Sequence, residues 1–541
     1  MAETRRADGN IVELSGRGSA LLRLLFRCQK ATGPAVCGSH LDEEFPMRRS
    51  KATVRLIGIP LATVLATSTA WAADPIRVTG VPQNPNPFAS CPIGASPQGG
   101  STNYVNAEVE PWLAVNPHTA GNLIGVWQQD RWSDGGAHGL VVGFSFDGGS
   151  TWGTTPLPFS ACAPGGLPYE RATDPWVSIG PDGTAYAVSV SFNASNNNNA
   201  VAAAVSTTGG RTWNNLKVII ANDEPGAQFF NDKESVTADP IHAGTAYAVW
   251  DRLESPNANP YADMHTQAYR GPTLFSKTVN GGQTWSPPKI IVNFVASRRQ
   301  TIGNQIVVDP RTGTLYNFFD LIQPPFGVSA GKVAFIKSTD QGASWTQPQI
   351  IADLRTVGVT DPNTGEPLRT GDIIPEPAID PSTGYLYVVW QDSRFSGGQF
   401  DEIAISKSTD GGSSWSTPSR VNTMTGRAAF NPSIRVNAVT AKVAVTYYDF
   451  RGLEAGNTTS LPTSIWLTTS PTAGGPSFVS EQLVSGPFNM RTAPMSRGFF
   501  VGDYQGLEVQ DAKFLPFFVQ TNSGNTTNRT DVFFARETPA Q

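Results

Sequence analysis

The octapeptide Ser145-Phe-Asp-Gly-Gly-Ser-Thr-Trp152 decides the fold, because variants of it recur along the chain. The other copies are Ser206 to Trp213, Thr278 to Trp285, Ser338 to Trp345, Ser408 to Trp415, and a decayed one with Gly475 in the glycine position that ends at Phe478. Successive clear copies start roughly 60–72 residues apart. This period is too long for a solenoid repeat and is typical of a four-stranded propeller blade.

Each position of the octapeptide has a physical task. The Asp carboxylate accepts hydrogen bonds from backbone N–H groups of its own turn. The glycine supplies a positive φ, and the Trp side chain folds back over the strands to bury apolar surface. Each clear copy follows an alternating apolar strand, and all but the first lead into another short one. We therefore expect the octapeptide to be a structural turn between the third and fourth strands of a blade.

A second repeated phrase supplies the first two strands of each unit. It begins with Glu110-Pro-Trp-Leu-Ala-Val and continues with Asn122-Leu-Ile-Gly-Val-Trp. Equivalent starts lie at Asp174, Glu234, Asn304, Glu376, Asn431 and Asp503. The sequence thus predicts an all-β, seven-bladed (alternatively six-bladed) β-propeller of four-stranded antiparallel blades. The last unit lacks a fourth strand, and residues 75–80 resemble one, so we expect them to close the ring.

The N-terminal part reads as a targeting signal. Residues 47–72 hold a charged segment with Arg48, Arg49, Lys51 and Arg55, an apolar run from Leu56 to Ala70, and an Ala-Trp-Ala cleavage site. The apolar run is shorter than the roughly 20 residues of a membrane span. We expect 47–72 to be a signal peptide, 1–46 to be a misassigned or disordered extension, and 73–541 to be a single propeller domain.

Removal of the signal leaves two cysteines, Cys91 and Cys162. Two cysteines in an oxidising compartment favour one disulfide, which would pin the segment before the first repeat to that repeat. The alternative is a pair of unrelated buried thiols. We expect a secreted or periplasmic protein.

Composition excludes several functions. The formal net charge is −5 and there is no basic patch, so we expect no nucleic-acid partner. We also expect no membrane contact after signal cleavage, and a monomer. With five His and no clustered His/Cys pattern, the chain predicts no cofactor. Structural calcium in the acidic loops stays open, although no EF-hand spacing is present.

The octapeptide resembles the Asp-box, or bacterial neuraminidase repeat, of the sialidase superfamily. The resemblance covers nearly all of the chain after the signal and implies a β-propeller. It also implies an exo-glycosidase that removes a terminal acidic sugar with three arginines, a Tyr nucleophile assisted by Glu, and an Asp acid/base. The Arg-Ile-Pro motif of that superfamily is absent, Ile76-Arg77-Val78 being the nearest string. The resemblance therefore assigns none of these roles by motif.

Blade topology narrows the search for a site. The start of a first strand and the end of a second strand lie on one face of a propeller, so their polar residues are expected to gather around the channel mouth. We predict three catalytic residues, Glu234, Glu376 and Tyr504. The predicted substrate-binding residues are Arg131, Arg171, Arg252, Arg394, Arg451, Glu110, Asp174 and Asp503. Arginines bind carboxylates through two hydrogen bonds, and paired carboxylates of different pKa suit glycoside cleavage.

Three functions remain open on this evidence. The first is a sialidase-like glycoside hydrolase acting on a glycan. The second is a propeller that binds glycan or protein without catalysis, and the third is a polysaccharide lyase. The Asp–Arg pairs at the strand ends have a purely structural alternative, in which they link adjacent blades.

Overall fold

A computed structural model describes residues 74–97, 99–224, 228–255, 270–294, 298–324, 330–470, 477–478 and 480–538. All of them lie in the unit Ala70–Gln541. The predicted extension and signal peptide fall outside the described residues, as does Gly475 of the decayed copy.

Consecutive strands pair in antiparallel groups of four. The first two groups are β2 (Asn103–Val115), β3 (Leu123–Trp132), β4 (Ala137–Ser145) and β5 (Gly153–Pro156), then β6 (Arg171–Ile179), β7 (Ala185–Phe192), β8 (Asn199–Ser206) and β9 (Asn214–Asn222). The next two are β10 (Phe229–Ala238), β11 (Ala246–Glu254), β12 (Thr273–Thr278) and β13 (Lys289–Val292), then β14 (Gln300–Val308), β15 (Leu315–Ile322), β16 (Gly331–Ser338) and β17 (Gln349–Leu354).

The later groups follow the same order. They are β20 (Glu376–Ile379), β21 (Leu386–Asp392), β22 (Glu402–Ser408) and β23 (Ser419–Arg420), then β24 (Ala429–Asn437), β25 (Lys442–Asp449), β26 (Pro462–Thr469) and β27 (Ser480–Asn489). The last group is β29 (Gly506–Gln510), β30 (Lys513–Thr521), β31 (Thr530–Phe534) and, from the N-terminal end, β1 (Ile76–Arg77). Outside these groups lie β18 (Val359–Thr360), β19 (Pro367–Arg369), β28 (Phe499–Phe500) and two short 3₁₀ turns, η1 (Ser393–Ser396) and η2 (Met490–Thr492).

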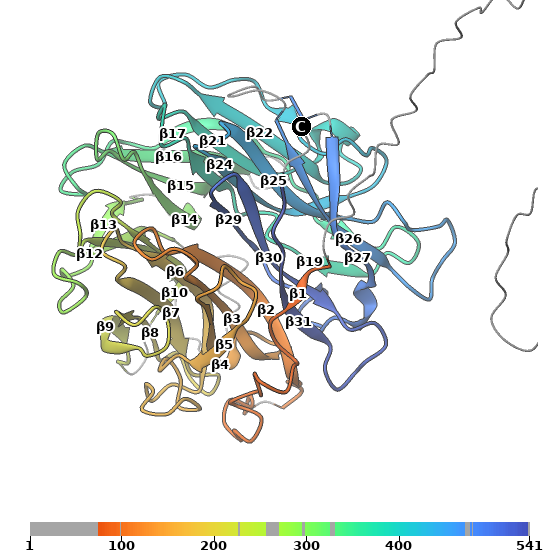
Figure 1. The fold of residues 1–541 in the computed structure, drawn as a ribbon, viewed down its shortest axis with the longest axis horizontal. Coiled ribbons are helices and arrows are strands. Elements are labelled where there is room, and N and C mark those ends of the chain that lie inside the picture. The colour runs from red at the N-terminus through yellow and green to blue at the C-terminus, as the bar shows by residue number, and fades with distance from the viewer. Residues whose placement is uncertain are drawn as a thin grey trace, which may run out of the picture. The chain divides into compact units, whose positions relative to one another are not determined.

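The first strands of the groups meet in a circle. Contacts run from β2 to β6, β10, β14, β20, β24 and β29, and β29 contacts β2 again. In Figure 1 first strands such as β6, β10, β14 and β29 lie inside, and β9, β13 and β17 lie at the periphery. This is the arrangement of a β-propeller, and the predicted all-β fold of four-stranded antiparallel units is confirmed. The number of blades stays a prediction. One bridge joins β31 of the last group to β2, and another joins β4 to β6, so the last group and the first two groups form one continuous sheet.

The N-terminal segment pairs with the last group, as predicted for the closing strand. Ile76 lies opposite Phe534 and Arg77 opposite Phe533 in an antiparallel ladder (Figure 1). Arg77 also forms an ion pair with Asp531, whose other oxygen accepts a hydrogen bond from Thr79 Oγ1 at 3.0 Å. The edge that β31 would otherwise expose is therefore covered.

The octapeptide forms the predicted turn between third and fourth strands. Asp147 Oδ1 accepts hydrogen bonds from the backbone N–H of Ser150 and of Thr151, each at 2.9 Å. Gly149 has a φ of 88°, and a Cβ there would lie 2.2 Å from the Phe534 ring. Trp152 Nε1 donates to the Gly149 carbonyl at 3.1 Å. The Asp and the glycine act structurally, as the motif predicts.

A disulfide joins Cys91 to Cys162, with 5.6 Å between their Cα atoms. It links the segment between β1 and β2 to the loop between β5 and β6, which is the pairing expected from the sequence. Within the described ranges, none of the helical segments has the length and apolar character that crossing a membrane requires.

Candidate functional site

Several of the first strands carry a bulge within their length. In β2, β6, β10 and β24 the register with the second strand slips at this point. The residue at the slip has a positive φ, which is 56° at Glu110, 52° at Asp174, 47° at Lys233 and 49° at Asn431. Bulges of this kind change the direction of side chains, and left-handed backbone at residues other than glycine is strained and common at functional sites.

The bulges correct one expectation. Glu110 and Asp174 lie inside their strands rather than at the strand starts, and Lys233 takes the matching place in β10 in place of Glu234. A shift by one residue turns a side chain to the other face of a strand. Lys233 therefore joins Glu110 and Asp174, whereas Glu234 does not.

A pocket of about 590 Å³ opens at the amino-terminal ends of the first strands β6 and β10. Its cationic lining residues are Arg131, Arg171, Lys233, Arg369 and Arg497. Its acidic lining residues are Asp134, Asp174, Asp232, Asp372 and Asp503. The volume lies in the range of about 300–1,000 Å³ that is usual for ligand sites.

Lys233 lies at the centre of the charged groups. Its Nζ is 3.1 Å from Asp174 Oδ1 and 4.0 Å from both Glu110 Oε1 and Asp503 Oδ2. It also lies 4.1 Å from the centroid of the Tyr504 ring, which faces it as a cation–π partner. Burial alone would lower the pKa of Lys233, but the neighbouring carboxylates outweigh burial and raise that pKa above its usual range. Lys233 is therefore a permanent cation.

Two buried carboxyls near Lys233, those of Glu110 and Asp503, have pKa values that are shifted in opposite directions. Burial raises the pKa of Glu110 to about 8, against a partial lowering by Lys233. Burial also acts on Asp503, but Arg369 and Lys233 hold the pKa of that carboxyl well below its usual range. Arg369 Nε donates to Asp503 Oδ1 at 3.1 Å and Nη2 to Oδ2 at 2.6 Å. At neutral pH Asp503 is charged and Glu110 is mostly protonated.

Arg131 is a buried cation without an ion-pair partner in the described part of the chain. Its side chain is 1% exposed, its Nη1 donates to Gln128 Oε1 at 2.7 Å, and its Nη2 donates to Ser496 Oγ at 3.0 Å. Its Nε has no hydrogen-bond partner among the described residues. Burial and the neighbouring Arg369 lower the pKa of Arg131 to about 10, which leaves it charged at neutral pH. A buried charge of this kind is costly unless a ligand of opposite charge completes it.

Arg131 and Arg369 share one aromatic ring. The guanidinium carbon of Arg131 lies 4.8 Å from the Phe500 ring centroid, and that of Arg369 lies 4.5 Å from it. Arg369 belongs to β19, which pairs in parallel with β28, the strand that holds Phe500. This small sheet brings the segment before β20 against the segment before β29 and places Arg369 at the pocket, which Arg131 enters from β3.

Asp372 follows Arg369 on the same segment and is only partly buried. Burial, together with the carboxylates of Asp401 and Asp503, raises the pKa of Asp372 to about 6. The Thr356 hydroxyl lies 2.8 Å from Asp372 Oδ2 and 2.6 Å from Asp401 Oδ2, so the two carboxyls share its single hydrogen. Gly371 lies between Arg369 and Asp372 in the chain. It leaves no room for a side chain, because a Cβ there would lie 1.7 Å from the Asp503 carbonyl oxygen. Asp372 is thus a carboxyl that lines the pocket and can carry a proton at mildly acidic pH.

The three predicted catalytic residues lie elsewhere. Tyr504 packs under Lys233, with its hydroxyl donating to the Pro175 carbonyl at 3.2 Å, and burial raises its pKa well above the usual range. Glu234 is 2% exposed and neither carboxyl oxygen has a hydrogen-bond partner among the described residues. Glu376 lines a separate cavity of about 360 Å³ and lies 3.3 Å from Arg435. None of the three lines the pocket.

The predicted arginines divide into two sets. Arg131 and Arg171 line the pocket. Arg252 instead lies 3.7 Å from the Phe229 ring centroid, Arg394 pairs with Asp392 at 2.7 Å, and Arg451 pairs with Asp449 at 2.6 Å. Both ion pairs join residues two positions apart in the chain, so the pairs themselves do not link adjacent blades. Arg394 reaches the preceding group separately, because its Nη2 donates to the Asp353 carbonyl at 2.5 Å.

Lys233 lies next to the predicted Glu234 in the chain, but no site role was predicted for Lys233, Arg369 or Asp372. The sequence does mark the segment that holds Arg369 and Asp372, because residues 355–375 form a long insertion between one unit and the next and break the repeat. Among the described residues, no group of three or more His, Cys, Asp or Glu is arranged to hold a metal ion.

No protein-family model matches the chain, and no curated protein matches it. Solved structures do match. The Hadza microbial sialidase Hz136 is 14% identical with a TM-score of 0.42, over 78% of this chain and 75% of that one. The GH93 α-L-arabinofuranosidase of Fusarium graminearum is 10% identical with a TM-score of 0.41, over 86% and 98%. A mutant form of the NanB sialidase from Streptococcus pneumoniae is 11% identical with a TM-score of 0.39, over 83% and 71%. The chain is thus distantly similar to sialidases and to α-L-arabinofuranosidases, at a level that transfers neither activity nor substrate.

Proposed function

We propose that this chain is an exported glycoside hydrolase whose pocket binds a terminal acidic sugar of the sialic-acid type. The observation that carries the proposal is Arg131, a guanidinium 1% exposed that lines the pocket without a carboxylate partner in the described residues. Asp503 and Asp174 act on Arg131 electrostatically without forming an ion pair with it, so a sugar carboxylate in the pocket would be its direct charged partner. Guanidinium groups bind carboxylates with well-oriented hydrogen bonds. The Cys91–Cys162 disulfide supports export to an oxidising compartment.

Carboxyl groups of different pKa supply the chemistry. Asp372, with its pKa raised to about 6, is the general acid that protonates the glycosidic oxygen as the bond to the leaving group breaks. An ionised carboxylate of the lining then stabilises the positive charge that develops on the sugar ring, or activates the water that attacks it. Asp503 is ionised throughout the relevant pH range, because Arg369 and Lys233 lower its pKa.

The proposal assigns no tyrosine nucleophile. Among the described residues that line the pocket there is no tyrosine, and the Tyr504 hydroxyl is bonded to the backbone at Pro175. This differs from the pattern that the sialidase resemblance implies, so the acid Asp372 takes the place of Glu234, Glu376 and Tyr504 in the proposal.

The test is turnover of a panel of fluorogenic glycosides that includes an α-sialoside, a glucuronide and an α-L-arabinofuranoside. We expect release from the acidic glycosides by the wild type, and a loss of about 10²-fold or more in Asp372→Asn, as for removal of a general acid. Asp182→Asn is the matched control, because Asp182 is exposed in the turn at the opposite end of β6. Turnover confined to neutral glycosides, or full activity of Asp372→Asn, contradicts the proposal.

A second candidate is a propeller that binds an acidic glycan without cleaving it. It is favoured by the ion pairs that hold Asp174 to Lys233 and Asp503 to Arg369, since carboxylates held in this way serve to orient cations. Calorimetric binding of a sugar acid without turnover of any glycoside supports this candidate. Ultraviolet absorbance that develops with a uronate polymer instead indicates a lyase.

A further inference from the structure

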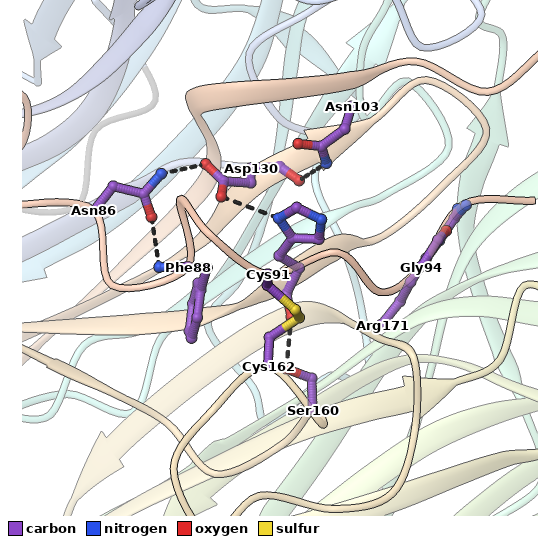
Figure 2. Close-up of a disulfide and its surroundings, with 10 residues drawn as sticks. Asn86, Phe88, Cys91, Gly94, Asn103, Asp130, Ser160, Cys162 and Arg171 are labelled. Atoms are coloured by element: carbon purple, nitrogen blue, oxygen red, sulfur yellow. Dashed lines mark hydrogen bonds and ion pairs between the residues drawn. A yellow bond between two sulfur atoms is a disulfide. The ribbon is translucent and has the colours of Figure 1, made fainter.

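The segment between β1 and β2 runs over the first group of strands and is anchored there by buried contacts (Figure 2). Asn86 Nδ2 donates to Asp130 Oδ1 at 2.6 Å, and Asn86 Oδ1 accepts from the Phe88 backbone N–H at 2.8 Å. Phe88 is 1% exposed, and a Cβ at Gly139 would lie 2.6 Å from its ring. These contacts hold residues 84–88, but they do not reach the pocket.

The disulfide holds the next part of this segment. Cys91 is bonded to Cys162, and the loop that contains Cys162 leads directly into Arg171 at the start of β6 (Figure 2). Both cysteines are half-buried. The bridge therefore ties together the two stretches of chain that meet at Arg171.

Arg171 is held by acceptors on both sides. Its Nε donates to the Gly94 carbonyl at 2.7 Å, three residues after Cys91, and its Nη1 donates to Asp134 Oδ1 at 2.8 Å. Its guanidinium carbon lies 4.8 Å from the Trp132 ring centroid. Arg171 and Ser96 both line the pocket. Residues 91–96, called the wall segment below, thus contribute Ser96 to the pocket lining and hold the lining residue Arg171 through the Gly94 carbonyl.

We propose that the Cys91–Cys162 disulfide is a positioning element of the pocket, in addition to any effect on global stability. Three residues of chain span at most about 10 Å, so the bridge limits how far the Gly94 carbonyl can move from Arg171. Without the bridge, Ser96 leaves the pocket lining and Arg171 loses the Gly94 carbonyl, so that Arg171 keeps only the Asp134 carboxylate and the Gly135 carbonyl as acceptors. The consequence for ligand binding rests on the proposed function of the pocket, whereas the consequence for the wall segment does not.

The experiment compares the folded, oxidised chain with the same protein after reduction by a phosphine, and with the Cys91→Ser/Cys162→Ser variant. Asp340→Ala is the matched control, because it removes hydrogen bonds of a turn between β16 and β17 without touching the pocket. Backbone hydrogen exchange of residues 93–96 and 134–136 is the primary readout. We expect it to rise about tenfold or more on reduction, while exchange in the strands of the other groups stays unchanged, as for a local opening.

The second readout is KM and kcat for the α-sialoside probe. We expect KM to rise about tenfold with a smaller change in kcat, as for a misplaced binding group. Unchanged exchange at 93–96 and 134–136, or an increase spread evenly over all groups of strands, overturns the inference. If exchange at 93–96 and 134–136 rises on reduction but the protein turns over no glycoside, the inference about the disulfide is supported and the proposed function is contradicted. Reduction of the folded wild type keeps the test valid if the double variant does not fold.

Discussion

The Arg369 guanidinium holds the Asp503 carboxylate through two hydrogen bonds, although the two residues are 134 positions apart in the chain. One belongs to the insertion before β20 and the other to the segment before β29. Both residues line the pocket, and their contact keeps a charged carboxylate beside Lys233.

Asp503→Asn is expected to destabilise the protein by about 3 kcal/mol, because it leaves the Arg369 guanidinium without its carboxylate partner, whereas Lys233 keeps its ion pair with Asp174. Urea unfolding at pH 7 measures the effect. The double variant Asp503→Asn/Arg369→Met is expected to recover part of the loss, since the unpaired charge is then gone. An unfolding free energy of Asp503→Asn equal to that of the wild type would show that the pair contributes nothing.

Stability is expected to fall as pH rises toward about 8 because of Glu110. The pKa of this carboxyl is about 8 in the fold, against an ordinary value of 4.5. A group whose folded pKa is raised contributes fully below its unfolded pKa, and the contribution is lost as pH rises through the folded pKa. Glu110→Gln keeps a neutral group at this position, so its unfolding free energy is expected to vary less between pH 5 and 9, measured by thermal unfolding. Identical pH dependence of the variant and the wild type would rule Glu110 out as the cause.

Activity toward an acidic glycoside is expected to decline above about pH 6. Asp372 must carry a proton to act as general acid, and its raised pKa of about 6 places the loss of that proton there. A profile of kcat/KM against pH measures the alkaline limb. Thr356→Val removes the hydroxyl hydrogen that the charged Asp372 carboxylate shares with Asp401, so the limb is expected to shift to higher pH. A shift to lower pH would contradict the assignment of this limb to Asp372.

Arg131→Met is expected to weaken the binding of a sugar acid while leaving the free energy of unfolding nearly unchanged. Replacing an unpaired buried charge with an apolar side chain of similar length leaves the unfolding free energy within about 1 kcal/mol of the wild type. The affinity for a free sugar acid is expected to fall by about tenfold or more, because a charge-assisted hydrogen bond is lost. Calorimetry measures the affinity, with Arg394→Met as the control at an arginine away from the pocket. Equal affinity of Arg131→Met and the wild type would remove the main support for an anionic ligand.

Asp147→Ala is expected to cost about 1 kcal/mol, since two backbone N–H groups and the Thr151 hydroxyl lose their acceptor. Slight burial would raise the pKa of Asp147, but the hydrogen bonds from Thr151, Ser145 and Ser150 lower it to about 2. The contribution of this turn is therefore present above an ordinary pKa of 3.8 and is lost as pH falls through about 2. Thermal unfolding between pH 2 and 7 measures both effects. A variant as stable as the wild type at pH 7 would show that the carboxylate does not hold the turn.

The sequence by itself determined the repeated unit, its turn and its closure. The octapeptide carries all the groups that its turn requires within eight residues, so its geometry depends on local hydrogen bonds such as those of Asp147. The pairing of β1 with β31 and the Cys91–Cys162 disulfide were predictable for a related reason. The last unit lacked a fourth strand, and residues 75–80 were the one segment that resembled one. After removal of the predicted signal, Cys91 and Cys162 were the two cysteines left to pair with each other.

The tertiary structure alone decided which side chains share the pocket. Lys233 replaces Glu234 there because a bulge shifts the strand by one residue, and no local pattern marks where the bulge falls. Arg369 and Asp372 enter from an insertion whose path depends on its pairing with β28, more than a hundred residues away. A site built from such long-range contacts depends on the register of several strands at once, whereas a turn depends only on its own residues.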